Sequence, residues 1–352
     1  MILKSFIQCL GVVGLLASAQ AYAAPEINAI GQMRQVRAKY EDTLVHMARA
    51  NNIGFIEIRA ANPHLDPWIP GEGANVVIPT MHILPNAPHQ GIVINLAEMR
   101  LYYYQDPEQA PISLPIGIGR EGLGTPKGKT KVVRKTEGPT WRPTARMREE
   151  DPKLPAVVKA GPDNPLGDFA LYLGWPQYAI HGTNKPYGIG RRVSSGCIRM
   201  YPEGIERLYS RVPVGTPVNV VDQPIKTAWV DDKLYLEAHT SQKDSLTMEK
   251  DGKLPDYEVS EKDIANIMEV AGKDAKEINW DAIHDTLRKR HGYPVVIAKR
   301  DLSVLQTTIS PKMSKASDVP LKMSKADDEQ YVEKADVKKI VKKTKTAFYQ
   351  ND

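Results

Sequence analysis

The sequence contains very little cysteine: of its 352 residues, only Cys9 and Cys197 carry a thiol. Cys9 lies in an N-terminal apolar stretch that we interpret as a cleaved export signal, so the mature chain keeps one cysteine. A lone thiol in an oxidising compartment has no partner within its own chain and forms no internal disulfide. The absence of a C-x-x-C pair also argues against a thiol redox protein.

Long apolar runs, charge excess and metal-ligand clusters are missing as well. Beyond the N-terminus no stretch approaches the roughly 18 apolar residues of a membrane-spanning helix, so we expect no transmembrane anchor in the mature protein. The net charge is +5, and +4 without Lys4, which is too small to predict nucleic-acid binding; no basic helix or zinc spacing supports it either. No His/Cys/Asp cluster suggests a metal, and we expect no cofactor.

The first 23 residues have the anatomy of a secretory signal peptide. A charged start precedes the apolar residues 6–16, and Ala21-Tyr22-Ala23 supplies the small-residue pattern at whose end we expect cleavage. A lipoprotein signal acylated at Cys9 is the alternative. It is disfavoured because Phe6-Ile7-Gln8 stands where small residues are needed and the apolar run continues beyond Cys9.

Residues 34–80 predict a small α/β unit. Asp42-Thr43 caps a first helix, and a second helix ends before Asn62-Pro63. A strand at 76–78 closes the unit. This pattern resembles a LysM domain, a strand-helix-helix-strand module that binds the sugar backbone of peptidoglycan, although Glu41 replaces the glycine usual before Asp-Thr. A spacer that only positions the next domain remains the alternative.

A proline-rich linker at 83–89 precedes a region of short strands. Many short strands separated by Gly/Pro turns predict a mainly β fold, a β-sandwich or barrel rather than βαβ units. One helix is expected at 202–211. Gly117 to Gly122 matches the dinucleotide pattern G-x-G-x-x-G, but Gly124-Thr125-Pro126 leaves no helix to follow, so we predict a strand and turn there. The expected strands are 91–95, 100–104, 132–135, 170–173, 179–180 and 218–221.

The chain beyond the β region reads as an appendage. Residues 223–300 predict a hairpin around 231–233, a helix capped by Ser260 that stops at Gly272, and a helix from Trp280 to Gly292. Residues 301–352 are Lys-rich and poor in apolar residues, with Lys-Met-Ser-Lys-Ala at 312–316 and again at 322–326. Such a segment cannot bury enough surface to fold, so we expect a disordered, solvated tail. Contact of its lysines with an anionic wall or membrane surface is the alternative.

Cys197 and His181 are the candidate chemistry. A thiol with an ordinary pKa of about 8.5 is only slightly ionised at neutral pH, so a nucleophilic cysteine needs a base. His181 stands sixteen positions upstream and supplies one. Gly196 removes a side chain before the thiol and frees backbone N–H groups that could stabilise an oxyanion.

The segments His181-Gly182-Thr183-Asn184 and Ser194-Ser195-Gly196-Cys197-Ile198-Arg199 resemble the active-site signature of L,D-transpeptidases, the YkuD-type catalytic domain. The resemblance runs from about Gly91 to Asp222. With Tyr102 to Tyr104 and Pro139-Thr140-Trp141 it is most similar to Gram-negative periplasmic enzymes, some of which attach the major outer-membrane lipoprotein to peptidoglycan. It implies a periplasmic location.

The resemblance also implies residue roles. Cys197 would be the nucleophile, His181 the general base and the Gly182 carbonyl its orienting group. The amides of Gly196 and Cys197 would form the oxyanion hole. Arg199 would bind substrate carboxylates, with a structural ion pair as the alternative. Ser195 stands where many members have a histidine, so no accessory donor is expected there.

The implied reaction is acyl transfer from the diaminopimelate–D-Ala bond of a tetrapeptide stem, through a Cys197 thioester, to an amine. The acceptor would be a second stem or a lysine of an outer-membrane protein. The alternatives are hydrolysis of the same stems, as an L,D-carboxypeptidase or amidase, and a non-catalytic wall-binding protein. Intact Cys197 and His181 argue against the last.

Overall fold

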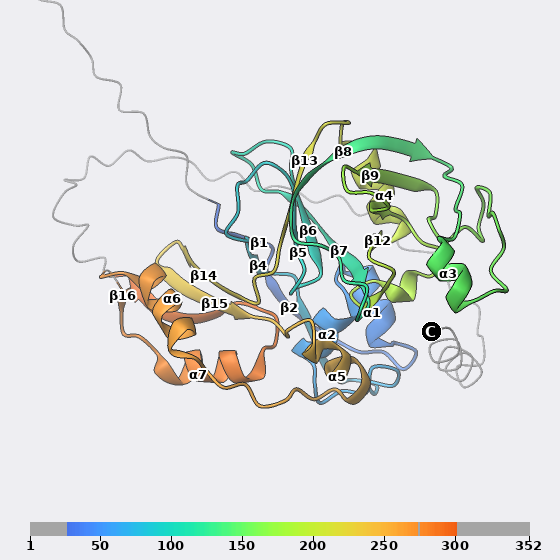
Figure 1. Cartoon of the computed structure of the whole chain (residues 1–352). Helices are drawn as coiled ribbons and strands as arrows, with labels where there is room; N and C mark the ends of the chain where they lie inside the picture. Colours follow the sequence, from blue (N-terminus) through green and yellow to red (C-terminus); the bar gives the residue numbers. More distant parts are fainter. Residues whose placement is uncertain (1–26, 274, 301–352) are drawn as a thin grey trace, which may run out of the picture.

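The computed structural model describes residues 27–273 and 275–300 (Figure 1). The predicted signal peptide (1–23) and the predicted Lys-rich tail (301–352) therefore lie outside the described residues. Among the described residues, no helix has the length and apolar character needed to cross a membrane.

The N-terminal unit pairs two strands around two short helices. Strand β2 (Met33–Arg37) pairs antiparallel with β3 (Asn75–Pro79), and α1 (Leu44–Ala50) and α2 (Phe55–Ala61) lie between them in the chain. The Thr43 side chain accepts the amide of His46, which is the predicted helix cap. The expected helices and closing strand are confirmed. Two further short strands, β1 (Ala29–Ile30) and β4 (His82–Ile83), flank the unit and pair with each other.

The centre of the molecule is one nine-stranded sheet that confirms the mainly β class. Its strand order is β11-β7-β12-β10-β9-β8-β13-β5-β6, and β6 also pairs with β7, so the sheet closes on itself into a barrel-like core. The predicted helix is α4 (Pro202–Tyr209), which contacts β9. The strands are β5 (Gly91–Asn95), β6 (Arg100–Tyr104), β7 (Ile112–Gly119), β8 (Gly128–Glu137), β9 (Phe169–Leu173), β10 (Ala179–His181), β11 (Arg192–Ser194), β12 (Ile198–Met200) and β13 (Pro217–Val221).

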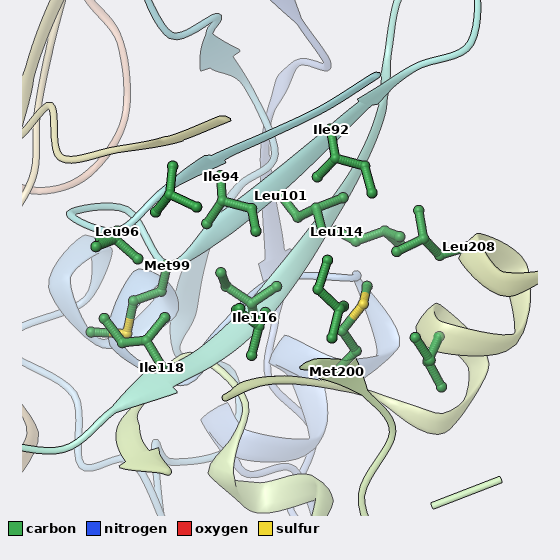
Figure 2. Close-up of a cluster of buried hydrophobic side chains, with 14 of the residues drawn as sticks. Ile92, Ile94, Leu96, Met99, Leu101, Leu114, Ile116, Ile118, Met200 and Leu208 are labelled. Atoms are coloured by element: carbon green, nitrogen blue, oxygen red, sulfur yellow. The ribbon is translucent and has the colours of Figure 1, made fainter. Parts of the chain in front are cut away.

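Figure 2 shows apolar side chains of the hydrophobic core packed against this sheet, which come mainly from β5, β6, β7, β12 and α4. Ile92, Leu101 and Ile116 are each fully buried within it. The same cluster takes in Phe55 from α2 and Met248 from α5 (Asp244–Asp251). The central cluster therefore takes in side chains from the N-terminal unit and from α5, while the N-terminal unit and the C-terminal sheet each also have a hydrophobic cluster of their own.

The C-terminal segment builds a sheet of its own. The predicted hairpin is β14 (Ile225–Val230) and β15 (Lys233–Ala238), and the sheet order is β14-β15-β17-β16. Helices α6 (Glu261–Ala271) and α7 (Trp280–Lys289) pack on it, at the lower left of Figure 1. Ser260 caps α6 and Gly272 ends it, as predicted. The prediction missed β16 (Ala275–Lys276) and β17 (Val295–Arg300). Helix α7 ends at Lys289, and its C-cap Arg290 has a left-handed conformation, so the helix stops before Gly292.

Both flanking parts dock on the central sheet through polar contacts. Arg49 of α1 makes a bidentate pair with Glu203 of α4, at 2.9 Å from each carboxylate oxygen. The amide of Phe55, at the start of α2, donates to the carbonyl of Ile189. On the other side, Arg192 of β11 donates to the carbonyl of Gln242. Strand β11 leads directly into the Ser-Gly-Cys turn, so these contacts fix the approach to the candidate site.

Candidate active site

The sheet brings His181 and Cys197 together. Strands β10 and β12 are parallel neighbours, with Ile180 opposite Ile198 and His181 opposite Arg199. Cys197 immediately precedes β12, two residues before Arg199. Because side chains alternate between faces along a strand, Cys197, Arg199 and His181 lie on the same face. The two residues predicted to carry the chemistry are thus diagonal neighbours across adjacent strands.

The His181 imidazole is buried and oriented by its neighbour. Its Nδ1 lies 2.6 Å from the carbonyl oxygen of Gly182. A carbonyl only accepts, so Nδ1 carries the hydrogen and donates it, and the neutral ring keeps a lone pair on Nε2. Burial and then the positive charge of Arg199 lower the pKa of His181 to about 4, against the opposing effect of the Gly182 and Leu166 carbonyls. The imidazole is therefore neutral, and basic at Nε2, at pH 7.

The Cys197 thiol is partly buried and held by the β9–β10 turn. Its Sγ donates to the carbonyl of Gln177, 3.4 Å away. Gln177 has a left-handed φ of 68°. Burial raises the pKa of Cys197, while a hydrogen bond from the Ala179 backbone and the charge of Arg199 lower it by less. The resting pair is thus a neutral thiol beside a neutral imidazole.

The turn before the thiol is built around Gly196. Its φ is 108°, and a Cβ at this position would lie 2.9 Å from the Tyr178 ring, so only glycine fits. The Gly196 amide donates to Ser194 Oγ at 3.1 Å, and the Ser194 hydroxyl donates to the Cys197 carbonyl at 2.5 Å. The Gly196 amide, predicted as an oxyanion donor, is thus engaged with Ser194 in this structure.

Thr125 anchors the same turn from the β7–β8 connection. Its hydroxyl donates to the Gly196 carbonyl at 2.8 Å and accepts the Gly119 amide at 3.1 Å. The Thr125 side chain is buried. The predicted strand and turn at 117–122 is confirmed, since β7 ends at Gly119 and Leu123 closes a turn onto Arg120. Sequence reasoning used Thr125 only to reject a nucleotide site and missed this anchoring contact.

Arg199 points its charge at the site and not at a carboxylate. Across residues 27–273 and 275–300, no ion pair joins Arg199 to Asp or Glu, and its buried Nε lacks a hydrogen-bond partner. Burial lowers the pKa of Arg199, and the nearby Cys197 sulfur raises it by less. The structural ion pair considered from the sequence is not what this part of the structure contains. A guanidinium is left facing the thiol and the imidazole.

A buried charged cluster lies where the three parts of the molecule meet. Ligand atoms of His82, Glu98 and Glu237 lie within 4.8 Å of one another, which is close enough to hold a metal ion. The Lys226 ammonium, however, already contacts Glu98 at 2.7 Å and Glu237 at 3.1 Å. A divalent ion would have to displace this cation, so the donor set does not suit a metal. The ion pairs of this cluster instead hold the three parts of the molecule together.

The comparisons with known proteins agree with this geometry. The YkuD model, the L,D-transpeptidase catalytic domain, matches residues 89–220. The probable L,D-transpeptidase YbiS of Escherichia coli (strain K12) is 45% identical over 246 residues, which is 66% of this chain and 80% of that protein. The probable L,D-transpeptidase ErfK/SrfK of Salmonella typhimurium is 41% identical over 252 residues, 70% of this chain and 79% of that protein.

A third relative extends the match further along the chain. The probable L,D-transpeptidase YcfS of Escherichia coli (strain K12) is 38% identical over 270 residues, 74% of this chain and 82% of that protein. These identities hold over most of each relative's length, well beyond the catalytic domain alone. The chain belongs to the L,D-transpeptidase family.

Proposed function

We propose that the protein is a periplasmic peptidoglycan L,D-transpeptidase that works through a thioester on Cys197. The observation that carries the proposal is the oriented pair. His181 donates from Nδ1 to Gly182 and keeps Nε2 as a base on the face that carries the Cys197 thiol. Family membership supports the reaction class, and the geometry supports the assignment of these two residues.

In the first step, His181 Nε2 takes the thiol proton as Sγ attacks the carbonyl carbon of the diaminopimelate–D-Ala bond. The oxyanion that forms is stabilised by the Cys197 amide; the Gly196 amide joins when Ser194 turns away from it. The intermediate collapses, the C–N bond breaks, and the proton on His181 passes to the leaving amine of D-Ala. A thioester of Cys197 remains.

In the second step an amine takes the place of D-Ala. It attacks the thioester carbonyl, loses its proton to His181, and expels the Cys197 thiolate, which recovers the proton. The products are a new amide and the free thiol, so atoms and protons balance. We assign Arg199 to a substrate carboxylate, because its guanidinium faces the site without a carboxylate partner in the described part of the chain.

We also propose that residues 34–80 form a LysM-like unit. The order β2-α1-α2-β3 supports this assignment, and docking through Arg49 and Phe55 makes the unit a fixed part of the enzyme. In this proposal the unit binds peptidoglycan and brings it to the catalytic domain at 91–222. Residues 223–300 form an accessory segment. The signal at 1–23 would direct export and then be cleaved.

The test is an incubation of the mature protein with tetrapeptide-bearing peptidoglycan fragments, with and without a lysine-terminated acceptor peptide, read by mass. We expect loss of D-Ala and a cross-linked or acceptor-linked product. Release of tripeptide stems without transfer would favour the hydrolase. Transfer that persists in Cys197→Ala would refute the thioester, and transfer at the wild-type rate in His181→Ala would remove its role as base.

A further inference from the structure

The connection between β8 and β9, residues 138–168, ends in a tight turn that packs against the base. The turn closes through the Gly167 amide, which donates to the Asn164 carbonyl at 2.9 Å. Gly167 has a φ of 63°, and a Cβ added to it would lie 2.7 Å from the Thr183 nitrogen and 3.0 Å from the Gly182 carbonyl carbon. The turn therefore lies directly on the backbone that orients His181.

Leu166 is the second point of contact. Its carbonyl oxygen would lie 3.3 Å from a Cβ added to Gly182, and this carbonyl also interacts with the His181 imidazole. The amide of Gly182 is fixed from the other side by the Phe169 carbonyl. The orienting carbonyl of Gly182 is thus held between the end of the connection and the start of β9.

The side chain of Asn164 holds this connection together. It is fully buried. Its Nδ2 donates to the carbonyls of Pro139 at 2.6 Å and Lys159 at 3.0 Å, with Val158 at 3.4 Å, and its Oδ1 accepts the Leu166 amide at 2.8 Å. One amide therefore joins the beginning, the middle and the end of the connection. Without it these buried backbone groups would lose their partners.

We infer that Asn164 is a positioning residue for His181: its amide fixes the turn whose Leu166 carbonyl and Gly167 backbone hold the His181–Gly182 step in place. The inference rests on the proposed role of His181 as base. Asn164 reaches neither the thiol nor the substrate carbonyl in this scheme. Asn164 acts by keeping the His181 imidazole oriented and shielded from water.

Asn62 offers a matched control. It is also fully buried, and its Nδ2 donates to the carbonyls of Ile58 at 2.9 Å and Val77 at 2.8 Å while its Oδ1 accepts the Val77 amide at 2.8 Å. The two asparagines therefore perform the same backbone-satisfying task, but Asn62 performs it within the N-terminal unit, between α2 and β3. Its loss should cost similar stability without moving His181.

The test compares Asn164→Ala with Asn62→Ala in the mature chain, using two readouts. The first is the rate of acyl-enzyme formation with tetrapeptide fragments, for which misplacing a base predicts a fall of about 10–100-fold in Asn164→Ala. The second is an NMR titration of His181, assigned by its disappearance in His181→Gln. We expect its pKa to move from about 4 upward toward 6.5 in Asn164→Ala as water reaches the ring. Asn62→Ala should change neither.

A second variant keeps the inference testable when Asn164→Ala does not fold. Gly167→Ala places a methyl group 2.7 Å from the Thr183 nitrogen and pushes the same turn off the His181–Gly182 step. Gly71→Ala is its control, because Gly71 also has a positive φ, 94°, but a Cβ there meets nothing within 4 Å. Gly167→Ala should slow acylation and raise the pKa of His181, and Gly71→Ala should do neither.

The two readouts separate this inference from the proposed function. A raised His181 pKa in Asn164→Ala, with no acyl-enzyme even in the wild type, keeps the positioning role and refutes the transpeptidase proposal. Unchanged acylation and an unchanged pKa in both Asn164→Ala and Gly167→Ala overturn the positioning role. An equal effect of Asn62→Ala on both readouts would overturn it too, because the effect would then be one of general destabilisation.

Discussion

The resting state of the nucleophile can be tested without any substrate. Burial lowers the pKa of His181 to about 4 and raises that of Cys197 above its ordinary value of about 8.5. At pH 7 the pair should therefore be neutral, with fewer than about three thiols in a hundred ionised. This differs from a thiolate–imidazolium pair, in which the thiol would be ionised from weakly acidic pH upward.

Alkylation by iodoacetamide measures the ionised fraction, because the thiolate is the species that reacts. We expect the rate constant at pH 7 to be below about three hundredths of its alkaline plateau, and to rise about tenfold per pH unit below the thiol pKa. Cys197→Ala gives the background. In His181→Gln the alkylation profile should stay close to that of the wild type, whereas acylation by tetrapeptide should fall by about 10²–10⁴-fold, the usual worth of a general base.

A flat alkylation rate from pH 5 to 8 would contradict this reasoning. So would a large drop in alkylation at pH 6–7 in His181→Gln, since a neutral imidazole does not hold a thiolate in place. Either result would show that the thiol and imidazole exchange their proton at rest. General-base activation during the attack would then give way to a preformed ion pair.

Two further predictions concern stability. The pKa of His181 falls from 6.5 in the unfolded chain to about 4 in the folded protein. The contribution of neutral His181 to the free energy of unfolding is therefore complete above pH 6.5, and roughly 3 kcal/mol of it is lost as the pH falls toward 4. Urea unfolding of His181→Gln should lack this part of the acid destabilisation, and a pH dependence identical to that of the wild type would contradict the prediction. Thr125→Val leaves the buried Gly119 amide and Gly196 carbonyl without a hydrogen-bond partner, which should lower the stability by about 1–3 kcal/mol and slow acylation. Thr125→Ser keeps the hydroxyl and should retain both the stability and the acylation rate. Equal behaviour of the two variants would show that the hydroxyl does not anchor the turn.

The proximity of His181 and Cys197 was predictable because both lie in short contiguous motifs. His181-Gly182 and Gly196-Cys197 carry their residue types in sequence, and the parallel pairing of β10 with β12 brings them side by side. The engagement of the Gly196 amide was not predictable. It depends on the rotamer of the Ser194 hydroxyl, which sequence does not determine.

The hydrogen bonds that hold the site in place could not be predicted from the sequence, because the partners are distant in the chain. Thr125 bonds to a carbonyl 71 positions away, and Asn164 to one 25 positions away. Both partners are backbone groups, so no residue pattern records them. The run Gly161-Pro162-Asp163-Asn164, rich in turn formers, could have predicted a turn there, but not its contact with Leu166 and His181.

Most of strand β7 was missed for a different reason, since only its end, within 117–122, was predicted as strand. It contains Pro115, Gly117 and Gly119, residue types that are depleted in strand interiors. The structure explains one of them: a Cβ on Gly117 would lie 2.6 Å from the Gly188 carbonyl oxygen, so close backbone approach requires glycine. Likewise β17 pairs with β15, which lies some 60 residues earlier, so its strand state depends on a distant partner.

The central claim is that Cys197 forms a thioester with the stem peptide. The most direct measurement is the intact mass of the mature protein, quenched in acid during reaction with a tetrapeptide-bearing fragment. We predict an adduct equal to the fragment minus D-Ala, located on the peptide that contains Cys197 and absent from Cys197→Ala. D-Ala release at a normal rate with no such adduct, or an adduct on another residue, would contradict the account.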